Sequence, residues 1–241
     1  MTPPRMLHAL LCMAAAAGTL LSATATRADD PALKPGLDPG GTAVAILADG
    51  FDYTNASLAK VLARDGEGEA IAWDAIDEDH RPYSTEGLGT AAAKAAAAKG
   101  NVRIVQVRMD PKDAASLARG IAFAVQTPAR IVLALLPRSE AAGHRVLVAA
   151  AQKFKTTLFI GSAPTPTLDE KARSDDIENL LLIEAGGGLA AAETLAEILG
   201  CEKDAIEGKS GPDLKRLFLD RHKETPPPEC KPKGAGETEK P

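Results

Sequence analysis

Gly186-Gly187-Gly188 is one candidate site for chemistry, because it follows a predicted strand and opens a predicted helix. The free N–H groups of a helix start and the helix dipole favour a small anion such as phosphate or carboxylate. The segment lacks the GxGxxG spacing and the lysine of a P-loop. A close-packed backbone turn that requires glycine is therefore the alternative interpretation.

A second candidate is an acidic loop, whose carboxylate oxygens are ligands that a hard cation such as Ca²⁺ accepts. The loop lacks the glycine of an EF-hand, so we expect a solvated turn and predict no metal site and no cofactor. Its charged residues are Asp74, Asp77, Glu78, Asp79 and His80.

Ser162 and Asp49 are a third candidate, for a divergent hydrolase that uses a hydroxyl and a carboxylate, with a metal at the acidic loop as a variant of that hypothesis. The histidines that follow the first 28 residues are His80, His144 and His222. We expect each of them to be a solvated surface residue.

The elements that must position these residues alternate between strands and helices. We predict strands at 43–48, 69–73, 102–108, 130–136, 156–161 and 180–184, and helices at 86–98, 112–126, 139–153 and 188–199. Strands such as RIVLALL are apolar at every position, as expected when both faces of a parallel sheet are covered. The predicted fold class is α/β, a three-layer doubly wound parallel sheet.

Three windows of the sequence carry a family resemblance. They are VAILADGFDY at Val44 to Tyr53, STEGLGTAAAKAAAA at Ser84 to Ala98, and EAGGGLAAAETLAEIL at Glu184 to Leu199. Together with the intervening segments EAIAWDAIDEDHRPYSTEG, NVRIVQVRM, GIAFAVQ and ARIVLALLP, they resemble the subtilase family of serine peptidases over about residues 42 to 200. The resemblance implies a trimmed subtilisin-like domain.

This resemblance places the catalytic Asp of the family on Ala48, its His on Leu88 and its nucleophilic Ser on Gly188. The oxyanion Asn falls in Ile160 to Thr167, which contains no Asn. Triad chemistry needs a hydroxyl, an imidazole and a carboxylate, and loss of the nucleophile or base costs about a million-fold in turnover. The resemblance therefore implies that the chain has no catalytic residues and is not an enzyme. Residues that shape the family's turns are retained: Gly50, Asp52, Gly87, Gly89, Thr90, Gly186, Ala190 and Ala191.

The chain divides into four predicted parts. Residues 1–28 have a positive start, a short apolar run and a small-residue end, which is typical of a secretory signal peptide and too short for a membrane anchor. Residues 29–41 form an extended leader, 42–224 the subtilase-like domain, and 225–241 a Pro-rich mobile tail. We therefore expect a periplasmic or secreted protein.

Charge and cysteine content limit the partners. The formal net charge is −5, which favours neither nucleic acid nor anionic lipid. Two cysteines remain after signal removal, Cys201 and Cys230. They form either a disulfide worth about 3 kcal/mol or two unpaired thiols.

The leading hypothesis is an exported, non-catalytic subtilisin-like pseudoprotease that binds an unknown protein partner or shapes an assembly. A divergent serine-type hydrolase and a small-anion binder at Gly186 to Gly188 are the alternatives. The family holds peptides by β-augmentation. Here one edge connection shortens to Met109 to Lys112 and the other, Ala134 to Pro137, ends in a residue without an N–H, so the same mode of capture is not expected.

Overall fold

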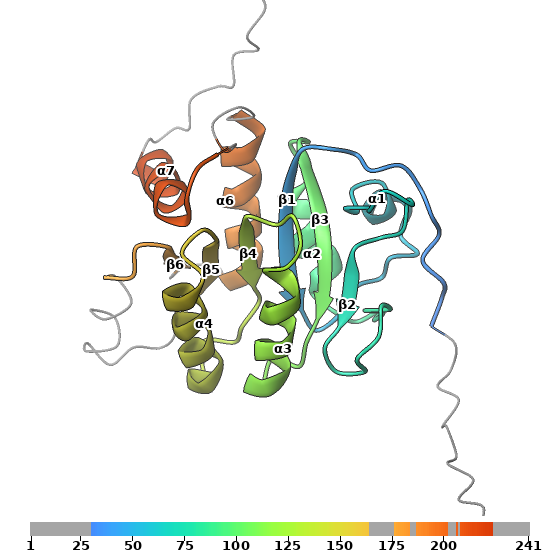
Figure 1. The fold of residues 1–241 in the computed structure, drawn as a ribbon, viewed down its shortest axis with the longest axis horizontal. Helices are drawn as coiled ribbons and strands as arrows, with labels where there is room; N and C mark the ends of the chain where they lie inside the picture. The colour runs from blue at the N-terminus through green and yellow to red at the C-terminus, as the bar shows by residue number, and fades with distance from the viewer. Residues whose placement is uncertain (1–29, 164–175, 184–186, 202–205, 207, 224–241) are drawn as a thin grey trace, which may run out of the picture.

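A six-stranded parallel sheet forms the centre of the molecule (Figure 1), with strand order β2-β3-β1-β4-β5-β6. The computed structural model describes residues 30–163, 176–183, 187–201, 206 and 208–223. The strands are β1 (Thr42–Ala48), β2 (Ala72–Asp74), β3 (Val102–Arg108), β4 (Ile131–Ala134), β5 (Leu158–Ser162) and β6 (Leu180–Ile183).

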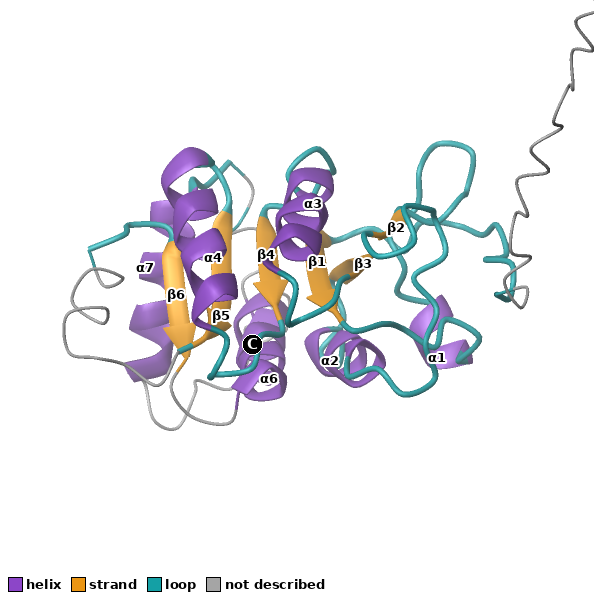
Figure 2. Ribbon diagram, turned by 90° about the horizontal axis from the view of Figure 1, so that it is seen from below, coloured by secondary structure: helices purple, strands orange, loops and turns teal. Residues whose placement is uncertain are grey.

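Helices cover both faces of the sheet, which confirms the predicted three-layer α/β fold (Figure 2). The helices are α1 (Ala56–Ala59), α2 (Gly89–Ala96), α3 (Ala114–Ala124), α4 (Ala141–Lys153), α6 (Gly187–Cys201) and α7 (Gly211–Lys223). Helices α1, α2, α6 and α7 lie on one face, and α3 and α4 on the other. Val44 and Ile46 of β1 face the first layer, whereas Ala45 and Leu47 face the second.

Local sequence explains where several helices begin. Helix α3 starts after Asp113, whose carboxylate accepts hydrogen bonds from the N–H groups of Ala115 and Ser116. Helix α2 is rich in alanine, and its small buried side chains allow it to pack closely against α6. These two helices flank the end of the sheet where the candidate site lies.

The structure differs from the sequence prediction in two places. The strand predicted at 69–73 is shifted to β2, because Arg64 and Ala70 pair first in a short antiparallel hairpin. Helices α1 and α7 were not predicted. Helix α1 has a single turn, capped by Asn55. Helix α7 follows Ser210, whose hydroxyl donates to the carboxylate of Asp213 and accepts from the backbone N–H of the same residue.

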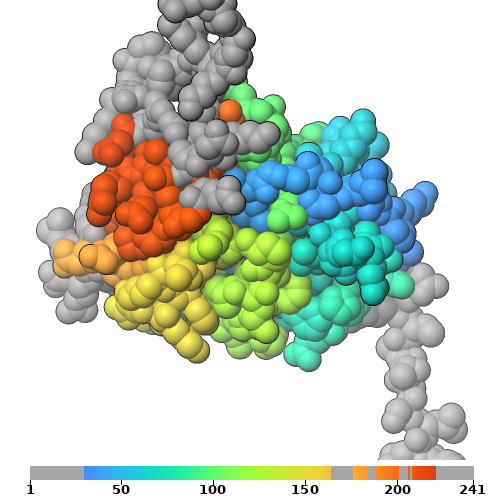
Figure 3. Space-filling model, turned by 45° about the horizontal axis from the view of Figure 1, so that its top comes forward, coloured from blue at the N-terminus to red at the C-terminus, as the bar shows by residue number. Residues whose placement is uncertain are grey.

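The described part of the leader, residues 30–41, has no regular secondary structure and lies on the surface beside the segments that follow β1 (Figure 3). Asp38 holds it in place, because its carboxylate accepts from the N–H of Arg64 and the guanidinium of Arg103, each at 2.8 Å. At its beginning, the Tyr53 hydroxyl donates to the carbonyl oxygen of Pro31 at 2.7 Å. The leader therefore adds contacts along the β2 side of the domain.

None of the helices in the described ranges combines the length and the apolar character needed to cross a bilayer.

Candidate functional site

The segment after β1 lies directly against the start of α2. Asp49 follows the last residue of β1, and its Oδ1 accepts a hydrogen bond from the N–H of Leu88 at 2.7 Å. Further along the same segment, the N–H of Asp52 donates to the hydroxyl of Thr90 at 2.7 Å. The first two windows of the sequence pattern therefore meet side by side at the carboxyl end of β1.

Glycines make this close approach possible. A Cβ built on Gly89 would lie 2.5 Å from the carbonyl oxygen of Gly50 and 2.6 Å from the ring of Phe51. A Cβ on Gly87 would meet the same carbonyl oxygen even more closely, and Gly50 itself has φ of +143°. Non-glycine residues adopt that φ rarely. The glycine pattern in these windows thus has a direct steric cause.

A hollow of about 390 Å³ opens beside this junction, at the carboxyl end of the sheet. The chain leaves β1 towards β2 and β3 on one side and later crosses to β4 on the other, so the hollow lies where the strand order reverses. Open α/β sheets bind their ligands at such points. The lining residues are Asp49, Leu88, Ala91, Ala92, Pro111, Leu135, Leu136, Pro137, Arg138, Ser162, Gly188 and Leu189.

The walls of the hollow are mainly apolar, and three side chains supply its polar chemistry. Asp49 brings a carboxylate and Arg138 a guanidinium, whose Nε donates to the carbonyl oxygen of Ala163 at 3.1 Å. Ser162 is only 2% exposed, and within the described part of the chain its hydroxyl has no hydrogen-bond partner. The first turn of α6 completes the wall through Gly188 and Leu189.

A solved structure has the same fold. It is the crystal structure of a cold adapted subtilisin-like serine proteinase, which superposes with a TM-score of 0.50 at 14% sequence identity, over 78% of this chain and 84% of that chain. This chain has a subtilisin-like fold. No family model and no curated protein sequence matches the chain.

Two of the three positions matched to the family triad line the hollow of this subtilisin-like fold, and the third does not. Leu88 immediately precedes α2 and is 65% exposed, and Gly188 lies in the first turn of α6. Both line the hollow, whereas Ala48 is buried in the core at the end of β1 and its neighbour Asp49 takes the place on the wall. Gly188 packs so closely on Leu135 that an added Cβ would overlap the Leu135 Cδ2.

The conclusion from sequence that the chain is not an enzyme is wrong. The solved structure with the same fold is a serine proteinase, and a likeness at 14% identity shows the fold without showing the status of individual catalytic residues. The same hollow also contains a hydroxyl and a carboxylate, those of Ser162 and Asp49. Replacement of three matched positions is therefore no evidence that the subtilisin-like fold of this chain is inactive.

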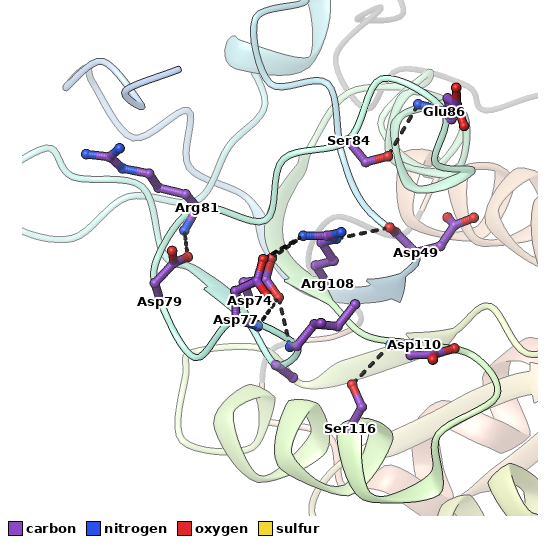
Figure 4. A network of polar contacts seen from close by, with 12 residues as sticks. Asp49, Asp74, Asp77, Asp79, Arg81, Ser84, Glu86, Arg108, Asp110 and Ser116 are labelled. Carbon is purple, nitrogen blue, oxygen red and sulfur yellow. Dashed lines mark hydrogen bonds and ion pairs between the residues drawn. The ribbon is translucent and has the colours of Figure 1, made fainter. Parts of the chain in front are cut away.

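The acidic loop after β2 differs from the solvated turn that we predicted. Arg108 donates from Nη1 to Asp74 at 2.7 Å and to Asp77 at 3.2 Å, and from Nε to the carbonyl oxygen of Asp49 at 3.3 Å (Figure 4). We call Asp74, Asp77 and Arg108 the Arg108 cluster. Asp74 is fully buried, and its Oδ1 accepts hydrogen bonds from the N–H groups of Ile76 and Asp77.

The electrostatics of the Arg108 cluster favour the ion pair. Burial of the Arg108 guanidinium opposes its charge, but the hydrogen bond and the negative charges of Asp74 and Asp77 outweigh that effect and raise the pKa of Arg108. These two carboxylates are thus engaged by a cation of the protein itself. In the described ranges, no three His, Cys, Asp or Glu side chains gather closely enough to hold a metal ion.

Other residues named in the sequence analysis have different outcomes. His144 was expected on the surface, but it is buried on the inner side of α4. Gly186 and Cys230 lie outside the described residues, and so does the side chain of Cys201, so the cysteine pair remains a prediction. Arg138 was missed because a single arginine in a loop carries no sequence signal of its own.

A second hollow of about 490 Å³ lies at the other end of the sheet order, beside β2. Its walls include Leu33 of the leader, Phe123 of α3 and His80. The His80 Nδ1 lies 3.1 Å from the carbonyl oxygen of Ala72, so this imidazole is held against the edge strand. This hollow lies away from the strand-order reversal and includes neither Ser162 nor the start of α6.

Proposed function

We propose that the chain is an exported protein with a subtilisin-like fold that acts by binding a polypeptide partner, one of whose apolar side chains enters the hollow beside Asp49. The observation that carries this proposal is a pair of exposed leucines at an apolar hollow. Leu88 is 65% exposed and Leu189 is 46% exposed, and both line it. The signal-peptide pattern of residues 1–28 supports export.

The energetics favour this location over the rest of the surface. Full burial of a leucine side chain contributes about 1.5 to 3 kcal/mol, so a partner that covers Leu88 and Leu189 gains about 2 to 3 kcal/mol from the exposed parts of both. A further apolar side chain of the partner would enter the hollow beneath them and contact Leu135 and Leu136, which line it. Leucines grouped at a concave surface mark a binding site more specifically than scattered ones.

Peptide binding to a double variant tests the proposal. We expect extended peptides with a central leucine or phenylalanine to bind the wild-type protein, measured by fluorescence anisotropy with a labelled peptide. Leu88→Ser combined with Leu189→Ser should weaken binding at least tenfold. Leu37→Ser is the matched control, because Leu37 is 94% exposed but lies on the leader and does not line the hollow. Equal affinity of the double variant and the control contradicts the proposal.

A divergent hydrolase is the second candidate, and the shared position of Ser162 and Asp49 on the hollow wall favours it. The Ser162 hydroxyl is available to attack a carbonyl carbon, with the Asp49 carboxylate as the acceptor of its proton. The test is labelling of the protein by a fluorophosphonate probe, with Ser162→Ala as the control. Labelling of the wild-type protein that disappears in Ser162→Ala supports a hydrolase. An unlabelled wild-type protein contradicts it.

A further inference from the structure

Three groups that bind anions face the same hollow. They are the first turn of α6, the hydroxyl of Ser162 on β5 and the guanidinium of Arg138 after β4. The first four N–H groups of an α-helix have no acceptor within the helix, and the helix dipole adds positive potential at that end. Helix α6 extends over 15 residues, and Gly188 and Leu189 of its first turn line the hollow.

The Ser162 hydroxyl points to a ligand independently of the helix. The residue is 2% exposed, and no described residue gives its hydroxyl a hydrogen bond. Because Ser162 lines the hollow, a ligand placed there can reach this hydroxyl. A ligand oxygen in the hollow would satisfy this hydroxyl.

Arg138 is held in a position from which it can complete an anion site. Its Nε donates to the carbonyl oxygen of Ala163, the residue that follows Ser162. Neither of its two terminal nitrogens has an acceptor among the described residues. A guanidinium binds a carboxylate in a planar, two-bonded arrangement that fits these groups.

The remaining walls select the kind of anion. Leu135, Leu136 and Pro137 provide apolar surface for a hydrocarbon side chain. Asp49 places a negative charge on the same hollow, which opposes a doubly charged phosphate more than a singly charged carboxylate. The free oxygen of Asp49 can also accept an N–H from the ligand, because Oδ1 alone is used by Leu88.

We infer that the hollow recognises an α-carboxylate attached to an apolar side chain, with Arg138, Ser162 and the first turn of α6 around the carboxylate. This inference rests on the proposed binding function and names the ligand chemistry of the same hollow. Two sources carry this chemistry, the carboxyl end of a polypeptide and a free apolar amino acid.

The test compares one peptide in two forms. A labelled hexapeptide that ends in leucine, with either a free carboxylate or a carboxamide end, is titrated into the wild-type protein. We expect the free acid to bind at least tenfold more tightly. Arg138→Gln and Ser162→Ala should each reduce that ratio towards one, because each weakens binding of the free acid more than binding of the carboxamide. Arg145→Gln, an exposed arginine of α4 that does not line the hollow, should retain the ratio.

The outcomes separate this inference from the proposed function. Equal binding of acid and carboxamide overturns the inference, but the proposed function stands. A preference for the acid that survives in both Arg138→Gln and Ser162→Ala also overturns it. If neither peptide binds and free leucine does not bind in calorimetry, both proposals fail. Competition by free leucine at the affinity of the peptide assigns the site to an amino acid, whereas weak competition assigns it to a chain end.

Discussion

Asp49 separates two regions of opposite character. On one side, its backbone carbonyl accepts from Arg108, whose guanidinium also contacts Asp74 and Asp77. On the other side, Asp49 lines the hollow together with Ser162, a residue that is only 2% exposed. In the Arg108 cluster one guanidinium binds two carboxylates of the same chain, whereas the hollow presents exposed leucines beside a few polar side chains.

The difference separates scaffold from site. A buried charge is tolerated only with a partner, so the Arg108 cluster fixes the acidic loop against the end of β3 and gains nothing from a ligand. In the hollow, by contrast, the exposed leucines gain free energy when a bound molecule covers them, and Ser162 is placed where that molecule can reach it. Substitutions in the Arg108 cluster should therefore affect folding, and those in the hollow should affect binding.

The largest effect is expected for Asp74→Ala. The change leaves Asp77, at 3.2 Å, as the remaining carboxylate that contacts the partly buried Arg108. It also removes the acceptor for two backbone N–H groups of the loop. Breaking a buried pair costs about 3 to 5 kcal/mol, and we expect about 3 kcal/mol less stability to unfolding by urea.

Glu197→Ala is the matched control for that experiment. Glu197 pairs with Lys99 at 3.4 Å, but both side chains are about half exposed. Exposed pairs contribute about 0 to 1 kcal/mol. If the two variants lose the same stability, the Arg108 cluster has no special structural role.

The next effect concerns the backbone junction behind the hollow. A Cβ on Gly87 would overlap the backbone of Gly50, which a change of side-chain rotamer does not relieve. Gly87→Ala should therefore cost about 1 to 3 kcal/mol in thermal or urea unfolding. In Gly66→Ala the added Cβ meets nothing within 4 Å, so a loss of less than about 0.5 kcal/mol is expected. Similar losses in both variants would contradict the close approach of Gly50 to α2.

The sequence predicted the sheet well because its signal is local. The apolar runs of β1, β3 and β4 and the helical periodicity between them appear at nearly the predicted residues. Of the three positions matched to the family triad, Leu88 and Gly188 line one hollow and Ala48 does not. The glycines have steric causes, since Gly87 and Gly89 approach the backbone of Gly50 and Gly188 approaches the side chain of Leu135. Patterns with a local steric or hydrophobic cause can be predicted from sequence.

The polar contacts could not be predicted because they join distant segments. Asp74 and Arg108 are 34 residues apart, and no sequence pattern distinguishes this buried aspartate from the exposed acidic residues beside it. Arg138 reaches the hollow through its contact with Ala163, 25 residues away. His144 lies among the buried residues of α4, so the packing of this helix overrides the usual surface preference of histidine.

A smaller effect is expected for the hydrogen bond between Tyr53 and Pro31 of the leader. Burial raises the pKa of the Tyr53 hydroxyl from 10.0 to about 12. Because the folded-state pKa lies above the unfolded one, the stabilisation is complete below pH 10 and is lost as the pH rises towards 12. Tyr53→Phe removes the bond to Pro31, so it should cost about 1 kcal/mol at pH 7 and flatten the pH dependence between 10 and 12. An unchanged pH dependence in the variant contradicts this assignment.

The smallest effect on folding is expected at the hollow itself. Leu88→Ala removes a side chain that is mostly exposed, so unfolding in urea should change by less than about 0.5 kcal/mol. Leu58→Ala alters the same residue type where it is fully buried on the same side of the sheet, and it should cost about 2 to 5 kcal/mol. A small change for Leu88→Ala would show that this leucine adds little to the free energy of unfolding, which agrees with its proposed role in binding a partner. A large loss of stability in Leu88→Ala would instead assign Leu88 to the core and remove the contrast between scaffold and site.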